Sequence, residues 1–365
     1  MAARAWPRLR SINRGHRAGR GHCGGIPDMR QLFEPRLVND RFGDPALLVD
    51  LRDEGRALLF DLGDLSRLPP RLMLRLSHVF LSHTHMDHFA GFDRLLRVVL
   101  GRKEQLVLTG GPDFVAQLEH RLRSYSWNVV HRYPVPLLLE AREIGLGGQG
   151  RRASFSSRNG FARADDAVFT PAGDVIHDEP LLRVRACFVD HDMPCLAFAL
   201  EEKPRPRVDR VRLASLGLAT GAWLRRLREA QARGEPPDTP IELHWRDAAG
   251  EHTEVRRLGE LAGVLREPGA GRRIGYVTDL RDSAANRQAL QALLAGVDDL
   301  FIESVFLQAD ADHAARKNHL TAAQAGRIAR ELGARRVEPF HFSPRYGGRE
   351  AELERELNAA WAGEA

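Results

Sequence analysis

Four side chains of metal-binding type occur within six residues, in the order His83-x-His85-x-Asp87-His88. In an extended loop, residues two apart project to the same side, so His83, His85 and Asp87 can converge while His88 turns toward a neighbouring point. Burying such groups without a partner is costly. Imidazole and carboxylate ligands without a thiolate cluster favour zinc, or a similar ion, in an open catalytic type of site. The alternative is a surface loop that is rich in histidine by chance.

The residues around this motif predict where it lies. The compact apolar run 78–82 is typical of a buried strand and ends directly at His83. Apolar residues at helical spacing follow from Phe92 to Val99. We therefore expect the motif on a loop between a strand and a helix.

Similar patterns predict the other elements of an α/β fold. Strands are expected at 46–51, 57–61, 105–109, 181–189, 195–200, 273–279, 300–303 and 336–341, and helices near 71–76, over 114–122 and over 321–332. Thr321 is the expected N-cap of the last helix, and Gly333 its stop. The Gly-, Ser- and Arg-rich stretch 145–166 shows no clear periodicity and is interpreted as a loop.

Composition sets wider limits. With 365 residues, of which 43% are hydrophobic, the chain can build a sizeable core, and no apolar run is long enough to span a bilayer. The net charge of +5 arises from residues 1–28, which contain six Arg and one Asp, while the rest is neutral. We interpret residues 1–28 as a disordered or mis-called extension, with a transit peptide as the alternative. Three cysteines without a pairing pattern suggest a reducing cytoplasm.

The composition changes at about residues 201–273, where the sequence is rich in Pro, Arg and Glu. We expect the prolines to break any long element there, and we interpret this region as an insertion. Residues 203–233 contain nine basic and two acidic side chains, an excess that would attract phosphates. The alternative is a solvated, charged insertion of no special function.

The histidine motif after an apolar strand resembles the signature of the metallo-β-lactamase superfamily. The downstream order His191, Asp279, Glu303, His319 and His341 is similar to the ribonuclease Z branch, the tRNA 3′-processing endonucleases. Other segments contribute to the resemblance, namely 59–63, 191–194, 201–204, 276–279 and 341–346.

The resemblance implies a four-layer αβ/βα sandwich of the α/β (α+β) class. The hydrolase domain would cover residues 29–349, with a basic arm inserted at about 201–273, and residues 350–365 would form a C-terminal helical tail. Two zinc ions per subunit are implied, with manganese or iron as other possibilities. The implied ligands are His83, His85 and His191 for one ion, Asp87, His88 and His341 for the other, and Asp279 as a bridge.

The implied reaction is cleavage of a phosphodiester by an activated water, leaving a 3′-hydroxyl and a 5′-phosphate. Asp87 would also orient the water, and His319 with Glu303 would protonate the departing 3′ oxygen. From the residues alone, Glu303 could equally be a solvated strand-end acid, and His319 an ordinary helix-start residue.

The implied substrate is precursor tRNA, held in part by Arg225, Arg226 and Arg228 of the arm. A homodimer is the family expectation, whereas the cytoplasmic location and the expected lack of membrane attachment come from the cysteines and the apolar runs described above. The arm departs from the family pattern, since Gly221-Ala222 stands where a Gly-Pro step is expected. Two alternatives therefore stay open: a diverged di-metal hydrolase acting on a small phosphodiester or ester, and a non-catalytic RNA-binding paralogue.

Overall fold

The computed structural model describes residues 32–51, 54–204, 206–247, 250–266 and 271–364. The predicted N-terminal extension, residues 1–28, lies outside the described residues.

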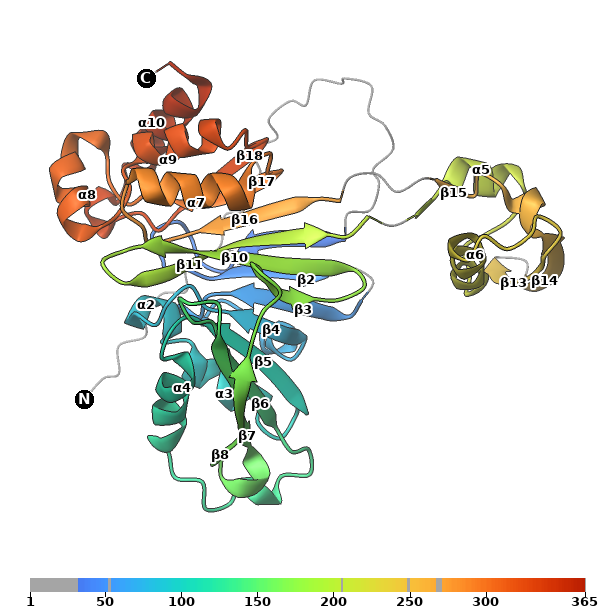
Figure 1. Cartoon of the computed structure of the whole chain (residues 1–365), viewed down its shortest axis with the longest axis horizontal. Coiled ribbons are helices and arrows are strands. Elements are labelled where there is room, and N and C mark those ends of the chain that lie inside the picture. Colours follow the sequence, from blue (N-terminus) through green and yellow to red (C-terminus); the bar gives the residue numbers. More distant parts are fainter. Residues whose placement is uncertain (1–31, 52–53, 205, 248–249, 267–270, 365) are drawn as a thin grey trace, which may run out of the picture. The chain divides into compact units, whose positions relative to one another are not determined.

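Eight strands form the first sheet, and their order in space follows their order in the chain (Figure 1). They are β1 (Phe33–Leu37), β2 (Leu47–Leu51), β3 (Arg56–Phe60), β4 (Leu76–Phe80), β5 (Gln105–Gly110), β6 (Leu138–Glu143), β7 (Gly150–Ser156) and β8 (Arg163–Phe169). Strands β3 to β6 run parallel, and the outer pairs are antiparallel. The motif that begins at His83 therefore follows a central, parallel strand, as predicted.

The second sheet has six strands in the order β18-β17-β16-β11-β10-β9. They are β9 (Val175–Asp178), β10 (Leu182–Asp190), β11 (Pro194–Glu202), β16 (Arg273–Val277), β17 (Asp299–Glu303) and β18 (Arg336–Phe340). Strands β10 and β11 form a hairpin, and β16, β17 and β18 are parallel. The carboxyl ends of these three strands consequently lie at one edge of the sheet.

Three hydrophobic cores separate four layers, which confirms the predicted αβ/βα sandwich. One core joins the first sheet to its helices, a second lies between the sheets, and a third joins the second sheet to its helices. Strand β2 shows the alternation: Leu47 and Val49 belong to the core between the sheets, whereas Leu48 faces the helices.

Helices cover the outer faces of both sheets. Those on the first sheet are α1 (Pro70–Met73), α2 (Met86–Phe89), α3 (Phe92–Val99) and α4 (Phe114–Arg123), and those of the second half are α7 (Ala284–Leu294), α8 (Ala311–Lys317), α9 (Ala322–Glu331) and α10 (Glu350–Ala362). At the start of α9, Thr321 Oγ1 accepts from the Gln324 backbone N–H at 3.1 Å, and Gly333 follows the helix with φ +65°. The predicted cap and stop are confirmed.

Helix α10 belongs to the helical layer. Its residues Leu353 and Leu357 are buried in the same core as α9, and a Cβ on Gly326 would lie 2.3 Å from the Leu357 carbonyl oxygen. Residues 350–365, expected as a helical tail, thus contain a helix that is packed closely against its neighbour.

The interpretation of 145–166 as a loop is wrong, because strand β7 and the start of β8 lie there. Strand β7 pairs with β6 and buries Ala153 and Phe155, which are two residues apart. Only two inward positions in β7 are apolar side chains, so the alternation was too short to stand out from its Arg and Ser neighbours.

Between β11 and β16, residues 206–266 form what we call the arm. It contains β12 (Arg207–Val208), α5 (Arg210–Ser215), α6 (Trp223–Ala232), β13 (Pro240–Asp247), β14 (Gly250–Arg257) and β15 (Leu265–Arg266). Residues including Leu213, Trp223, Leu227 and Leu243 form its own hydrophobic core. The expectation that prolines prevent any long element is wrong for the hairpin of β13 and β14, because Pro240 stands at the first position of its strand.

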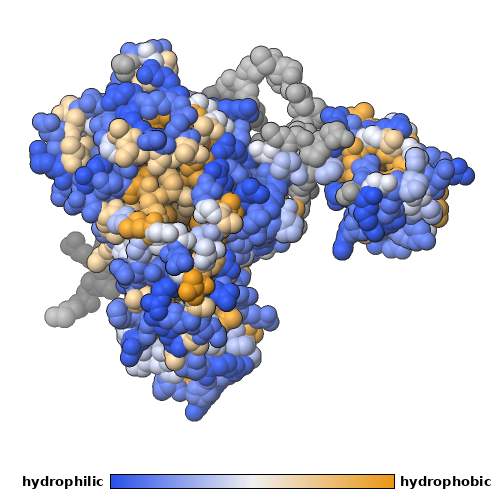
Figure 2. Space-filling view, viewed as in Figure 1, coloured by the Kyte–Doolittle hydropathy of each residue, from blue (hydrophilic) through white to orange (hydrophobic). Residues whose placement is uncertain are grey.

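In the space-filling view, hydrophilic residues cover most of the visible face of the arm, with smaller hydrophobic areas between them (Figure 2). Among the described residues, no helix is both long and apolar enough to cross a membrane.

Candidate metal centre

The predicted site residues come from the ends of strands in both sheets. The β4–α2 loop and α2 supply His83, His85, Asp87 and His88, and the β10–β11 turn supplies His191. Asp279 lies two residues beyond β16, His341 directly follows β18, and Glu303 is the last residue of β17. Carboxyl ends of parallel strands meet at one edge of a sheet, where α/β proteins bind their ligands. All seven predicted metal ligands are brought together at this edge.

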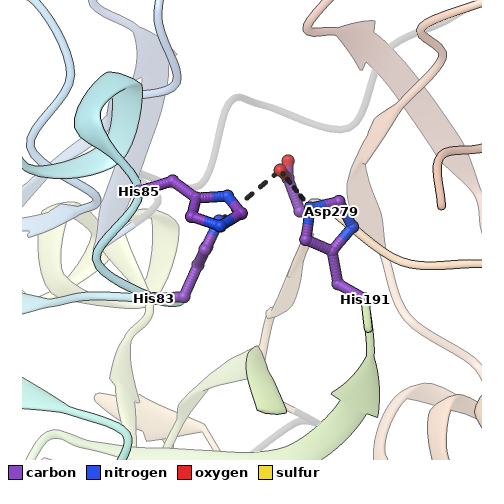
Figure 3. A group of neighbouring side chains, drawn as sticks. All are labelled: His83, His85, His191 and Asp279. Carbon is purple, nitrogen blue, oxygen red and sulfur yellow. Dashed lines mark ion pairs between the residues drawn. The ribbon is translucent and has the colours of Figure 1, made fainter. Parts of the chain in front are cut away.

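One group consists of His83, His85, His191 and Asp279, whose potential ligand atoms lie within 4.8 Å of one another. Figure 3 shows the three imidazoles and the carboxylate pointing toward a common space. Asp279 Oδ2 lies 3.3 Å from His191 Nε2 and 3.6 Å from His83 Nε2. Four ligand-type groups within such a distance can hold one ion.

The second group is Asp87, His88 and His341. Asp87 Oδ2 lies 3.2 Å from His341 Nε2 and 3.4 Å from His88 Nε2. The other oxygen of Asp279, Oδ1, lies 3.4 Å from His88 Nε2 and 3.0 Å from His341 Nδ1. Asp279 therefore offers one oxygen to each group.

The expected convergence of Asp87 with His83 and His85 is wrong. Helix α2 begins at Met86, so the extended alternation ends at His85, and Asp87 and His88 belong to a helical turn. That turn carries both side chains into the second group. The motif thus supplies His83 and His85 to the first group and Asp87 and His88 to the second.

Buried nitrogen atoms without hydrogen bonds support a metal centre. In the described part of the chain, His83 Nε2, His88 Nε2 and His341 Nδ1 are buried and make no hydrogen bond of acceptable geometry, although each lies within 3.6 Å of an Asp279 oxygen. Leaving such atoms unsatisfied costs free energy, which a bound cation would remove. Imidazole and carboxylate donors without thiolate fit zinc or a similar divalent ion.

A buried carboxylate, Asp61, orients His88. Its Oδ2 lies 2.9 Å from His88 Nδ1, which leaves Nε2 directed at the two groups. Asp61 also accepts hydrogen bonds from the Ser82 N–H at 2.7 Å, the Ser82 hydroxyl at 2.8 Å and the Tyr276 hydroxyl at 2.9 Å. A carboxylate behind a ligating histidine fixes the ring and makes it a better ligand.

His191 is oriented by the main chain. Its Nδ1 lies 2.9 Å from the Asn318 carbonyl oxygen, which accepts the N–H of that nitrogen. Asn318 itself has φ +57°, where helix α8 ends. Sequence reasoning gave no role to Asp61 or Asn318. The position of an acid directly after the apolar strand β3 was a usable signal for Asp61, but no pattern marks a carbonyl group.

Strained backbone is concentrated at this edge. Asp61, Asp279 and His341 have φ values of 59°, 47° and 60°, in the left-handed region that non-glycine residues rarely adopt. Each follows the last residue of a strand or lies two residues beyond it. Such conformations persist where the surrounding structure imposes them, and they are common at functional sites.

The protonation states of His83 and of the carboxylates are those of metal ligands. Burial, with a contribution from His88, lowers the pKa of His83 to about 2, so this imidazole is neutral. Burial opposes ionisation of Asp87 and Asp279, but contacts with His88 and His341 outweigh it and keep the pKa of both carboxyls below its usual range. Neutral imidazole and ionised carboxylate are the forms that bind cations. Against the effect of burial, the charge of Asp279 raises the pKa of His88 and of His341 well above its usual range, so a cation would displace a proton from each of these two rings.

Glu303 and His319 form a separate pair beside the centre. Glu303 Oε2 lies 2.8 Å from His319 Nδ1, and Oε1 accepts the Leu320 N–H at 2.9 Å. Although burial opposes it, the charge of His319 lowers the pKa of Glu303 to about 2; against burial, Glu303 raises the pKa of His319.

The His319 side chain retains 17% exposure, whereas Glu303 is fully buried. The ring centroid of His319 lies 4.9 Å from that of His191 and 5.5 Å from that of His341. With Asp279 and His341, Glu303 and His319 form a third group of ligand-type side chains, whose potential ligand atoms lie within 4.8 Å of one another. Because Glu303 Oε2 pairs with His319 and Oε1 accepts from the Leu320 N–H, we assign Glu303 and His319 to proton transfer and not to metal binding. The pair can hold a proton at the edge of the centre.

Arg225, Arg226 and Arg228, predicted to contact RNA, lie on α6 of the arm and belong to neither group. The Arg225 side chain is 87% exposed and pairs with Glu229 at 3.1 Å. Arg226 donates two hydrogen bonds to Glu235, at 3.0 and 2.6 Å.

Comparison with known proteins gives two informative relatives. The ribonuclease Z of Deinococcus radiodurans is 35% identical over 308 residues, covering 84% of this chain and 87% of that one. The ribonuclease Z of Natronomonas pharaonis is 30% identical over 324 residues, covering 87% of each. The crystal structure of the human short-form tRNase Z superposes with a TM-score of 0.50 at 17% identity, over 86% of this chain and 92% of that chain, which supports the fold. No protein-family model matches the chain.

Proposed function

The chain belongs to the ribonuclease Z family, and from this premise we propose that it is a metal-dependent endoribonuclease that removes the 3′ trailer from precursor tRNA. The observation that carries the proposal is the pair of side-chain groups that share Asp279. Two-metal phosphodiesterases need two such groups at bridging distance.

We assign His83, His85 and His191 to one zinc ion, Asp87, His88 and His341 to a second, and Asp279 to both. The same ligands could also bind manganese or iron, but zinc is the metal that we expect for this ligand set. When bound, the two cations would supply an activated water and positive charge beside the scissile phosphate. The chain's part is to hold the donors in place through Asp61 and Asn318, which fix two of the imidazoles.

His319 is placed to donate a proton. Glu303 stabilises its protonated form, and the ring lies at the edge of the centre with part of its surface exposed. We assign to it protonation of the departing 3′ oxygen, which leaves a 3′-hydroxyl on the tRNA and a 5′-phosphate on the trailer. Asp87 is the candidate for orienting the attacking water.

The arm is the candidate for holding the body of the RNA. Residues 203–233 carry nine basic and two acidic side chains, and neutralising phosphates with such residues releases counterions. Arg225 is almost fully exposed and could exchange its partner Glu229 for a phosphate. A homodimer and a cytoplasmic location are further parts of the proposal, and they rest on the family resemblance and on the cysteine pattern respectively.

A small phosphodiester substrate is the second candidate. The arm favours it in one respect, since residues 240–257 form a hairpin and the expected Gly-Pro step is absent. In that case the same centre would act on a substrate that does not need the arm.

One assay separates these functions. Purified protein is incubated with a 3′-extended precursor tRNA and, separately, with bis(p-nitrophenyl) phosphate, each with and without a chelator. Chelator-sensitive cleavage at the 3′ side of the tRNA is expected. Turnover of only the small ester would support the second candidate, and cleavage that survives complete metal removal would contradict both.

A further inference from the structure

A pocket separate from the metal centre lies against the same loop. It has a volume of about 520 Å³ and is lined by residues including Thr84, Phe89, Asp93, Gln117, Arg121 and Tyr125. No step proposed above uses any of these side chains. They come from the β4–α2 loop, α2, α3, α4 and the segment after α4.

The pocket and the metal centre share a wall. Thr84 stands between His83 and His85, and residue side chains alternate in extended backbone, so Thr84 faces away from its two neighbours. Consecutive Cα atoms are about 3.8 Å apart, which places the wall of the pocket one residue from two candidate ligands. In α2, Phe89 also lines the pocket and is adjacent in sequence to a candidate ligand, His88. A group in the pocket would therefore be a near neighbour of a phosphate at the centre.

Aromatic rings give the pocket a flat, fixed surface. Tyr125 is 40% exposed, and Trp127 supports its ring edge-on at a centroid distance of 5.6 Å. The guanidinium of Arg121 lies 5.9 Å from the centre of the Phe89 ring. An exposed ring that is already held in place loses little freedom when a second ring stacks on it.

The charges of the pocket cancel. Arg121 donates two hydrogen bonds to Asp93, at 2.8 and 2.7 Å. A paired guanidinium and carboxylate do not repel a neutral ring that enters beside them.

Gln117 adds an unused hydrogen-bonding atom. Its Oε1 is buried and has no partner among the residues that the structure describes. A buried acceptor without a donor is costly, and a ligand with an N–H group would remove this cost. A nucleobase combines a ring that stacks with an exocyclic amino group that donates, as in adenine, cytosine and guanine.

We propose that this pocket binds an unpaired nucleobase of the RNA substrate, next to the phosphate that is cut. The base stacks on Tyr125, and its exocyclic amino group donates to Gln117 Oε1. This inference rests on the proposed ribonuclease function. It adds a contact to the bases beside the cut, which the arm does not provide.

The test compares Tyr125→Ala with wild type on two substrates. Stacking of one base on an aromatic side chain corresponds to a loss of roughly 5- to 150-fold in kcat/KM for precursor tRNA when the ring is removed. Turnover of bis(p-nitrophenyl) phosphate, whose rings carry no amino group and no sugar-phosphate chain to hold them against Tyr125, is expected to fall by much less. Tyr133→Ala is the matched control, since Tyr133 is 42% exposed and does not line the pocket.

Two further measurements identify the contact. In the first, single abasic nucleotides are placed at successive positions around the cut. At one of these positions the abasic nucleotide should slow cleavage by wild type, and wild type and Tyr125→Ala should then have the same kcat/KM. Gln117→Met, which keeps the length and removes the acceptor, should reduce the preference for cytosine over uracil at that position.

Each outcome decides the inference. If wild type cleaves precursor tRNA and Tyr125→Ala equals it, the pocket is not a base site, while the proposed function stands. If Tyr125→Ala loses both activities equally, its role is structural and the inference is wrong. If wild type hydrolyses only the small ester, the proposed function itself fails.

Discussion

At the metal centre, charged and titratable side chains from segments as far apart as His83 and His341 converge and are mostly buried, whereas on helix α6 of the arm Arg225 and Arg226 pair with near neighbours in sequence. Asp61 and Asp279 are at most 2% exposed and contact groups more than twenty residues away. In the arm, Arg225 pairs with Glu229 and Arg226 with Glu235.

The two regions therefore differ in how well they tolerate substitution of a charged residue. A buried charge depends on every partner around it, so one substitution leaves the others uncompensated. An exposed ion pair contributes little and can exchange partners with a phosphate. We therefore expect single substitutions to abolish function at the centre and only to weaken it in the arm.

The largest effect is expected for Asp279→Asn. This change removes a charge that faces both groups, so the protein should lose tightly bound metal at both and lose cleavage of tRNA and of the small ester. Metal analysis of the purified variant, together with circular dichroism to verify folding, checks this. A folded Asp279→Asn variant that retains two metal ions and activity would contradict the bridging assignment.

Next in size is His319→Ala, for which we expect a roughly 10²- to 10⁴-fold loss of kcat on tRNA with unchanged metal content. Esters with a nitrophenolate leaving group need no proton donor and should be affected less. His313→Ala, on the adjacent helix α8, is the control. Equal losses on both substrates would argue against a role as proton donor.

The same pair predicts a pH dependence. Glu303 raises the pKa of His319, against the effect of burial, so the protonated form persists above the usual range for histidine. Because the proton donor is the protonated form, kcat should fall as the pH rises through this raised pKa. Profiles of kcat against pH for wild type and His319→Ala test this, since the variant should lack that descending limb.

A smaller effect is expected for Asp61→Asn, which keeps the size of a residue behind the centre. Changes to such supporting carboxylates typically cost about 10- to 100-fold in metal affinity or activity. Chelator competition measures the affinity. Tyr276→Phe, which removes one of the hydrogen bonds to Asp61, should cost less; a greater loss than for Asp61→Asn would place the support elsewhere.

The smallest effect is expected in the arm. Replacing Arg225 and Arg228 by Ala should raise KM for precursor tRNA, leave kcat and small-ester turnover unchanged, and reduce the salt dependence of binding by about 0.9 per lost phosphate contact on logarithmic axes. Arg246→Ala with Arg257→Ala, in the hairpin of the arm, is the matched control. Equal effects of the two pairs would mean that charge alone, without position, governs binding.

The contrast also explains how far the sequence could be interpreted. The strands that precede the site are short apolar runs, and ligand-type residues directly after them could be recognised together with the family resemblance. The Asn318 carbonyl, which orients His191, could not be predicted from the sequence because every residue has a backbone carbonyl group. Asp87 lies in a different metal-binding group from His83 and His85 because helix α2 begins at Met86, and no pattern in the sequence marks that helix start.

The hairpin at 240–257 escaped prediction for another reason. Its outward face after Pro240 is charged or polar except for Val255, which is 60% exposed, and of its inward face Ile241 and Leu243 are the two fully buried members. Prolines before the first strand obscured so short a pattern. Small cores in insertions give weaker periodicity than strands that are buried on both faces.

The division of ligands between the two halves of the sandwich has a consequence for assembly. His83, His85, Asp87 and His88 belong to the half built on the first sheet, which ends with β8 at Phe169, and His191, Asp279 and His341 belong to the other half, so neither half alone completes either group. Bound cations would link the two halves, and their binding free energy would add to the free energy of unfolding. A chain nicked between β8 and β9 should stay joined while metal is plentiful and separate more readily once the metal is withdrawn.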